Sequence, residues 1–177
     1  IDRNTGGIVI AAKTAEGLRV MNQKIRDREL KKYYLCIVHG TLPRPAGRLE
    51  GYILKDEAKK QVTVSSRPRP GAKTAVTLYE TLAVRNGLSL VRCQLITGRT
   101  HQIRAQFAAA GHPLLGDGKY GSERQNKRYG RSYQALYSYR LEFCFTTDAG
   151  ALAPLDGQQF QVEQVDFVTE YFPGFSL

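Results

Sequence analysis

Leu-Ser-Leu-Val-Arg-Cys-Gln-Leu-Ile-Thr-Gly-Arg-Thr-His-Gln-Ile-Arg, residues 88–104, holds one strand and the start of one helix, and the fold is best understood outward from it. Residues 88–96 alternate in hydropathy, which is typical of a strand with a core face. Residues 97–104 then place two guanidiniums, an imidazole, an amide and two hydroxyls at a strand-to-helix junction. Because helix N-termini attract anions, adding Arg99 there does little for stability. It indicates a strongly negative ligand, such as a nucleic-acid backbone.

The strand in this stretch has a sequence partner directly before it. Residues 74–84 also alternate, and Asn86-Gly87 is the preferred pair for a two-residue type I′ turn. The two runs therefore predict an antiparallel hairpin. After the junction we expect a helix to about Ala110, because Gly111 is a good C′ residue and Pro113 prevents continuation.

The predicted helix carries a buried arginine. We expect Ile103, Phe107 and Ala110 to pack on the sheet, and Gln106 to face solvent. Arg104 then points inward, where an unpaired guanidinium is costly and needs a carboxylate partner. The residues alone leave open a purely structural arginine, bound to carbonyls or to Glu80, Glu142 or Asp117.

The N-terminal part of the chain predicts a strand followed by a helix. Residues 7–12 are a continuous apolar run, which predicts a short strand buried on both faces. Thr14 is a good N-cap for an amphipathic helix of about three to four turns. Its buried face is expected to carry Leu18, Met21 and Ile25.

Further alternating runs complete the predicted sheet. A strand over residues 31–40 should point Tyr34, Cys36 and Val38 to one face and Tyr33, Leu35 and Ile37 to the other. Other strands are predicted near residues 49–54, 61–64, 136–145 and 160–165. The sum predicts an α+β fold: a single domain, residues 1–177, on a mostly antiparallel mixed β-sheet flanked by helices and loops.

Composition points to a polyanionic partner. Of the 177 residues, 42% are hydrophobic and 24% are charged. The chain has 26 Lys and Arg but only 16 Asp and Glu, which gives a net charge of +10. A surplus of this size on a folded domain is the usual mark of nucleic-acid binding, although a basic surface can also serve solubility alone.

The sequence also bounds location and metal chemistry. No apolar run is long enough to cross a bilayer and no secretory signal is present. Three widely spaced cysteines, Cys36, Cys93 and Cys144, argue against disulfides and zinc, and favour a reducing cytoplasm. The chain opens at Ile1 without Met, so we interpret it as part of a longer protein.

Several candidate functional residues have a structural alternative. Asp2-Arg3-Asn4-Thr5-Gly6-Gly7 is turn chemistry when taken alone. Tyr34 could be an ordinary core tyrosine with its hydroxyl at the edge. His39, His101 and His112 have no metal-ligand spacing, so no metal site is predicted.

Four segments, in this order, resemble the RluA-type RNA pseudouridine synthases. Residues 1–7 (Ile-Asp-Arg-Asn-Thr-Gly-Gly) resemble the catalytic-aspartate motif, and residues 32–40 (Lys-Tyr-Tyr-Leu-Cys-Ile-Val-His-Gly) the tyrosine-bearing strand. Residues 97–104 with 111–117 resemble the arginine motif, which residues 116–121 complete. The resemblance covers residues 2 to about 145, and it is most specific over 97–104.

The resemblance implies a role for each matching residue. Asp2 is the catalytic carboxylate, Tyr34 stacks on the target base and helps to move the C5 proton, and Arg104 pairs with Asp2. Leu95 and Ile96 supply apolar wall, and the implied substrate and RNA contacts add Arg3, Arg99, Thr100, His101 and Gln102. Basic residues are then expected to line a phosphate path around the pocket: Arg67, Arg69, Lys73 and those of residues 124–131.

The implied reaction turns a specific uridine of structured ribosomal or transfer RNA into pseudouridine. The base must leave the helix stack, and a dry pocket must hold Asp2 ionised beside Arg104. Asp2 acts either as nucleophile or by abstracting a ribose proton, and no cofactor or metal is required. We expect a cytoplasmic monomer without a membrane partner. The alternatives are a non-catalytic basic RNA-binding domain and, less favoured, a nuclease using His101 or His112 with Asp117.

Overall fold

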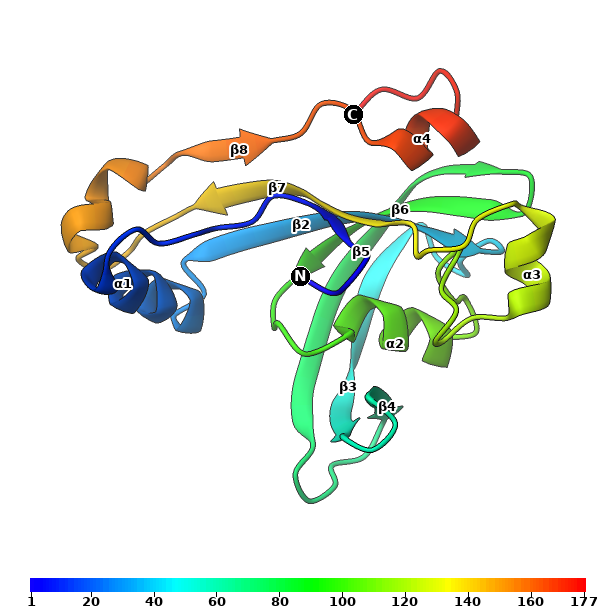
Figure 1. Cartoon of the computed structure of the whole chain (residues 1–177), viewed down its shortest axis with the longest axis horizontal. Helices are drawn as coiled ribbons and strands as arrows, with labels where there is room; N and C mark the ends of the chain where they lie inside the picture. The colour runs from blue at the N-terminus through cyan, green and yellow to red at the C-terminus, as the bar shows by residue number, and fades with distance from the viewer.

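One eight-stranded sheet organises the protein, whose residues 1–177 are all described by a computed structural model (Figure 1). The strands are β1 (Gly6–Gly7), β2 (Leu30–His39), β3 (Ala46–Asp56), β4 (Gln61–Ser65), β5 (Lys73–Arg85), β6 (Leu88–Leu95), β7 (Leu136–Phe143) and β8 (Gln159–Gln161). The helices are α1 (Ala15–Arg26), α2 (Gln102–Ala109), α3 (Glu123–Arg128), the 3₁₀ helix η1 (Gly150–Leu155) and α4 (Asp166–Tyr171). None of these helices is long and apolar enough to span a bilayer.

The sheet is mixed but mostly antiparallel, so the predicted fold class is confirmed. Its strand order is β1-β7-β2-β6-β5-β3-β4, with β8 also paired to β7. Only β1 and β7 run parallel. The β5–β6 hairpin forms as predicted, because Asn86 (φ 51°) and Gly87 (φ 76°) both adopt the left-handed backbone that a type I′ turn needs.

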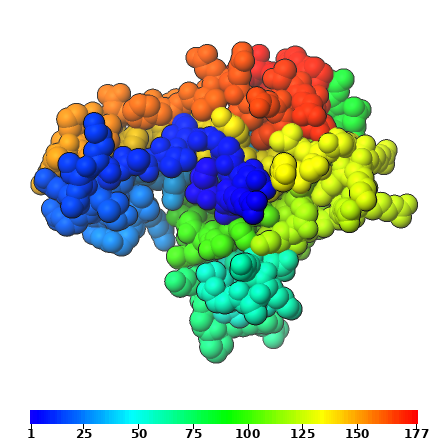
Figure 2. Space-filling view, in the orientation of Figure 1, coloured from blue at the N-terminus to red at the C-terminus, as the bar shows by residue number.

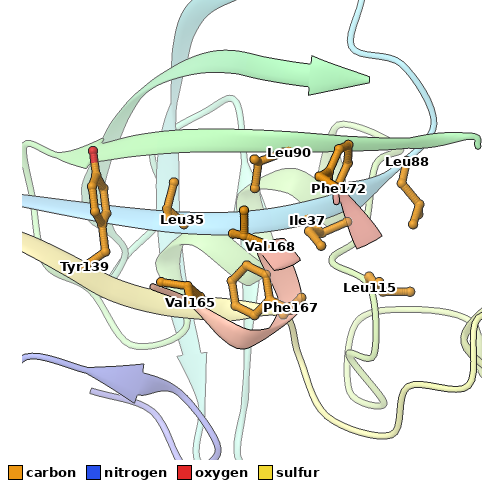
Figure 3. Close-up of a cluster of buried hydrophobic side chains, with 11 residues drawn as sticks. Leu35, Ile37, Leu88, Leu90, Leu115, Tyr139, Val165, Phe167, Val168 and Phe172 are labelled. Carbon is orange, nitrogen blue, oxygen red and sulfur yellow. The ribbon is translucent and has the colours of Figure 1, made fainter. Parts of the chain in front are cut away.

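Strand β2 divides the core between two faces of the sheet, as its alternation predicts. Leu35 and Ile37 pack with the C-terminal helix α4, which lies across one face (Figure 3). Cys36 and Val38 pack with Ile103 and Phe107 of α2 on the other face. The site described below lies on the α2 side.

The N-terminal apolar run does not form the predicted buried strand. Only Gly6 and Gly7 pair with β7, and Val9 and Ile10 are 66% and 37% exposed. The reason is competition for one edge, because β8 pairs with Arg140–Glu142 of β7 and so occupies the positions that a longer β1 would need.

Helix α1 begins as predicted but presents a different face. Thr14 caps it by accepting a hydrogen bond from the Gly17 amide at 3.0 Å. Met21 is buried, but Leu18 and Ile25 are 52% and 40% exposed. The inner position that remains is taken by Lys24, whose buried ammonium lies 2.7 Å from Glu29; this ion pair helps to fix which face of the helix turns inward.

The C-terminal segment also departs from the prediction. The strand expected over 160–165 is limited to β8, and the chain then turns into α4, which the sequence did not predict. Val165, Phe167, Val168 and Phe172 all pack into the core cluster of Figure 3, so tertiary burial rather than local propensity places this helix.

A projecting finger, residues 51–74, extends from the sheet below the N-terminal residues (Figures 1 and 2). It comprises the end of β3, strand β4 and the beginning of β5. It carries six Lys and Arg side chains against two carboxylates, Asp56 and Glu57. The finger is therefore a cationic surface next to the α2 junction.

Candidate active site

A pocket of about 410 Å³ opens where the N-terminal turn, strand β2 and the β6–α2 junction meet. This volume lies in the range of small-molecule sites. Its walls combine residues from three of the four resembling segments with Leu95 and Leu136; they are Ile1, Asp2, Thr5, Lys32, Tyr34, Leu95, Gly98, Arg99, Thr100, His101, Gln102, Ile103 and Leu136.

Asp2 is carried into the pocket by a tight turn anchored on the sheet edge. The Thr5 amide donates to the Asp2 carbonyl at 3.0 Å, and Gln134 Nε2 donates to the Arg3 carbonyl at 2.6 Å. Position 7 requires glycine, because its φ is +113° and a Cβ there would lie 2.2 Å from the Ser138 carbonyl oxygen. The two glycines thus serve close approach to β7 as well as the turn that the sequence suggested.

Tyr34 reaches the same pocket from β2, which β7 separates from β1. Gly7 and Tyr34 are both register partners of Ser138 on β7, which lies between β1 and β2. The β2–β7 register shifts between Tyr33 and Tyr34, so a bulge lies directly beside the site. Burial raises the pKa of Tyr34, with nearby Asp2 also raising it, so the hydroxyl stays protonated at neutral pH.

Arg104 joins Asp2 to a second, fully buried carboxylate. Its Nη1 lies 3.3 Å from Asp2 Oδ2, so the two residues that the resemblance paired lie together. Its Nε and Nη2 donate to the two oxygens of Asp117 at 2.7 and 3.0 Å. Although burial opposes it, the pKa of Arg104 is raised because Asp117 and then Asp2 stabilise the guanidinium. Arg104 therefore contacts both Asp2, the partner that the resemblance implies, and Asp117, one of the structural partners that the residues alone left open.

Helix α2 is fixed to the sheet by an amide and hydroxyl network. Gln102 Oε1 accepts from Thr97 Oγ1 at 2.8 Å and from the Arg99 amide at 3.0 Å. Its Nε2 donates to the Val76 carbonyl and to Thr77 Oγ1, at 3.0 and 2.9 Å. All four hydrogen-bonding positions of this side chain are thereby used within the protein. Gln102 lines the pocket, but its predicted RNA contact has no free polar atom to make it.

The other glutamine of α2 corrects the predicted helix faces. Gln106 is 3% exposed, not solvent-facing, and it accepts from Thr77 Oγ1 at 2.7 Å. It also donates to the carbonyls of Leu49 and Ala75. Ala110, predicted on the sheet face, is exposed beyond the end of the helix.

The predicted RNA contacts divide into those at the pocket and those away from it. Leu95, Thr100 and His101 line it, together with Arg99, whose Nε donates to the Thr74 carbonyl at 3.0 Å. Arg99 also lines a second hollow of about 200 Å³ with Lys55 and Lys73 of the finger, so cations continue outward from the pocket.

The remaining predicted contacts do not reach the pocket. Ile96 and Arg3 are absent from its walls, and Arg3 is exposed. In the Arg124–Arg131 segment, Lys127 pairs with Glu123 and Arg131 with Glu170, and no residue of this segment lines the pocket. Nothing in the sequence of residues 124–131 indicates that this segment lies away from the pocket.

Lys32 is a pocket residue that the sequence interpretation missed. It lies two residues before Tyr34, so both side chains lie on one face of β2, and its ammonium has no carboxylate within 4.0 Å. Burial lowers the pKa of Lys32 from its usual value. The same period-two alternation that predicted the face of Tyr34 could have predicted that Lys32 lies beside it.

The alternative nuclease pairing is not assembled. Neither candidate histidine is hydrogen-bonded to Asp117: His101 Nδ1 lies 2.8 Å from the Tyr120 hydroxyl oxygen, and His112 Nδ1 lies 2.9 Å from the His39 carbonyl oxygen, away from the pocket. Asp117 is instead engaged by Arg104. The structure contains no cluster of three or more His, Cys, Asp or Glu side chains arranged to hold a metal ion.

Comparison with solved structures defines the class of fold. The human protein RNA Pseudouridylate Synthase Domain Containing 1 superposes with a TM-score of 0.70 at 20% identity, covering 96% of this chain and 76% of that one. Human RNA Pseudouridylate Synthase Domain Containing 4 gives a TM-score of 0.66 at 22% identity, covering 87% and 65%. The chain therefore has a pseudouridine synthase fold.

Sequence comparison gives the family. The model described as RNA pseudouridylate synthase matches residues 1–109, and the chain belongs to this family. An uncharacterized RNA pseudouridine synthase of Mycoplasma genitalium, MG370, is 38% identical over 81% of this chain and 45% of its own length. Ribosomal large subunit pseudouridine synthase C of Escherichia coli is 32% identical over 82% of this chain and 46% of its own. The chain thus spans about half the length of these relatives.

Proposed function

We propose that this chain is the catalytic domain of an enzyme that isomerises a specific uridine to pseudouridine in structured ribosomal or transfer RNA. The observation that carries the proposal is the Asp2 carboxylate, 3.3 Å from Arg104 Nη1, at the wall of a pocket that also holds Tyr34. Asp2 is only 21% exposed, so it is partly desolvated and yet paired with a cation.

The proposed reaction needs a carboxylate, an aromatic face and a narrow pocket. The uridine leaves the RNA stack and enters the pocket beside Tyr34. The ionised Asp2 either attacks the sugar or removes a ribose proton, the C1′–N1 bond breaks, and the detached uracil turns over. C5 of the uracil then bonds to C1′; in the first route this breaks the Asp2–C1′ bond, and in the second Asp2 returns the ribose proton. The C5 proton departs as the uracil N1 gains one, so atoms balance without a cofactor.

The charge distribution supports an RNA partner. The protein has a net charge of +10, and the cations Arg99, Lys55 and Lys73 follow one another from the pocket mouth onto the finger. Such a path suits a phosphate backbone leading to a flipped nucleotide. We propose that the protein acts on RNA in the cytoplasm as a monomer.

The test is direct mapping of the product. RNA from cells that lack the gene is incubated with the full-length protein, and pseudouridines are mapped by carbodiimide modification and primer extension. We expect new pseudouridine at a defined position in ribosomal or transfer RNA. RNA that gains none at any position would disprove the proposed function.

Arg99→Ala is expected to weaken RNA binding through loss of one phosphate contact. The slope of log Kobs against log[salt] should become shallower by about 1, because one cation fewer releases counterions. Arg85→Ala is the matched control, since Arg85 is exposed at the opposite end of β5 from the Thr74 carbonyl that holds Arg99. A salt slope unchanged in Arg99→Ala, or changed equally in Arg85→Ala, would contradict this contact.

Tyr34→Phe should preserve base stacking but remove the hydroxyl that handles the C5 proton. We expect the single-turnover rate to fall by at least about 100-fold with little change in RNA affinity. Tyr33→Phe serves as the control, because Tyr33 follows the other face of the same strand and packs toward the opposite core cluster. Equal rates for Tyr34→Phe and wild type would remove this hydroxyl from the mechanism.

A further inference from the structure

The imidazole of His101 is held by a second aromatic residue outside the motif that contains it. His101 Nδ1 lies 2.8 Å from the Tyr120 hydroxyl oxygen, and the two rings meet edge to face at 73°. Tyr120 belongs to the turn that also holds Asp117, and its amide donates to Asp117 Oδ1 at 3.1 Å. One turn therefore contacts both Arg104 and His101.

The hydrogen bonds around the Tyr120 hydroxyl favour one position for its proton. The Val62 amide, which can only donate, lies 2.9 Å from the hydroxyl oxygen. Because the oxygen already accepts that bond, the arrangement favours a hydroxyl hydrogen directed at His101 Nδ1, 2.8 Å away. A neutral imidazole that accepts at Nδ1 carries its proton on Nε2. Nε2 makes no hydrogen bond within the protein, although His101 lines the Asp2 pocket.

The backbone and the surrounding charges agree with a neutral ring aimed at a ligand. His101 has φ 51° and ψ 23°, a left-handed conformation that is uncommon outside glycine and that clusters at functional sites. Burial lowers the pKa of His101; Arg104 and Lys119 add to this, while Asp2 and Asp117 oppose it. The ring is therefore an uncharged donor at neutral pH.

We propose that His101 donates a hydrogen bond from Nε2 to a carbonyl oxygen of the flipped uracil, and that Tyr120 is the residue that positions it. The inference rests on the proposed function. An uncharged N–H suits an uncharged carbonyl, whereas the pocket cations Lys32 and Arg99 suit phosphate oxygens. Tyr120 does not line the pocket, so it acts through His101.

The tautomer is measured on the free protein. Long-range ¹H–¹⁵N correlation spectra of the ¹⁵N-histidine-labelled full-length protein, assigned with His101→Gln, should show His101 protonated at Nε2 alone near pH 7. In Tyr120→Phe the Nδ1 acceptor bond is lost, and both tautomers should appear. A wild-type ring protonated at Nδ1, or charged, would overturn the inference whatever the activity.

The contact is measured by single-turnover pseudouridine formation on the RNA identified above. His101→Ala should lower the rate about 10-fold, as expected for one neutral hydrogen bond, and Tyr120→Phe should lower it less because a fraction of the rings keeps the Nε2 proton. Because Tyr120 acts through His101, the double variant should lose no more than His101→Ala alone, about 10-fold. His101→Gln, which keeps a side-chain N–H donor, should recover part of the loss. Tyr129→Phe, which removes a hydroxyl bonded to the Asn86 carbonyl, should match wild type.

The outcomes separate this inference from the proposed function. A rate in His101→Ala within twofold of wild type overturns the uracil contact, and additive losses in the double variant overturn the positioning role of Tyr120. A wild-type protein that makes no pseudouridine overturns the proposed function, and the uracil contact with it. The tautomer measurement needs no RNA, so it tests the His101–Tyr120 arrangement whether or not the protein forms pseudouridine.

Discussion

Asp2→Asn in the full-length protein should lower the single-turnover rate of pseudouridine formation by at least about 1,000-fold while the protein remains folded. The amide is neutral, so it can neither attack the sugar nor abstract a proton, and loss of such a group has effects of this order. The fold should survive because Arg104 keeps its bidentate contact with Asp117, and Asp2 is 21% exposed. Product mapping and urea unfolding on the same preparation check both parts.

Asp166→Asn is the matched control, since it makes the same change at an exposed carboxylate on α4, across the sheet from the pocket. It should leave the rate unchanged. An Asp2→Asn variant as active as wild type would show that Asp2 is not the catalytic group. If wild type and Asp2→Asn both bind RNA and neither forms product, the non-catalytic RNA-binding domain is the better description.

Local patterns predicted those elements whose signal is carried by neighbouring residues. The hairpin followed from Asn86-Gly87 and two alternating runs, and α1 began at its predicted cap, Thr14. The alternation of β2 correctly assigned Tyr34 and its neighbours to two faces. Period two and turn chemistry are properties of short segments, so they survive folding with little change.

Features decided by distant residues could not be predicted in this way. Competition from β8 for the edge of β7 limits β1 to Gly6–Gly7, and no local property of the apolar run reveals it. Helix α4 is stabilised by the core that it covers. Gln106 looks like a surface residue until the strands that supply its partners are in place. The resemblance supplied the pairing of Asp2 with Arg104. Only the structure shows that Arg104 contacts Asp2 and Asp117 at the same time.

Asp117→Asn should be the most destabilising single change at the site. Asp117 is completely buried and accepts two hydrogen bonds from Arg104 and two more from the backbone amides of Lys119 and Tyr120. Removing its charge leaves the 7%-exposed Arg104 guanidinium with only the longer contact to Asp2. Breaking one side of a buried ion pair costs about 3–5 kcal/mol of unfolding free energy. Urea unfolding at pH 7 measures this loss.

A double-mutant cycle separates the ion pair from general damage to the turn. Arg104→Met removes the cation, so adding it to Asp117→Asn should cost much less than adding it to wild type. In each comparison that measures the effect of Arg104→Met, the two proteins have the same residue at position 117. Any damage to the turn is therefore the same in both and cancels. Fully additive losses would show that the stability of this region does not depend on the ion pair.

The pH dependence of stability gives an independent check with a definite sign. Burial alone would raise the pKa of Asp117, but its pKa is lowered because Arg104 and the amides of Lys119 and Tyr120 stabilise the carboxylate. A carboxylate with a lowered folded-state pKa stabilises the protein fully above its unfolded pKa of about 3.9. That contribution is lost as pH falls through the folded pKa. Unfolding free energies measured from pH 6 downward should therefore fall more steeply below pH about 4 in wild type than in Asp117→Asn. Parallel curves would mean that the Asp117 carboxylate is not the group through which Arg104 stabilises the fold.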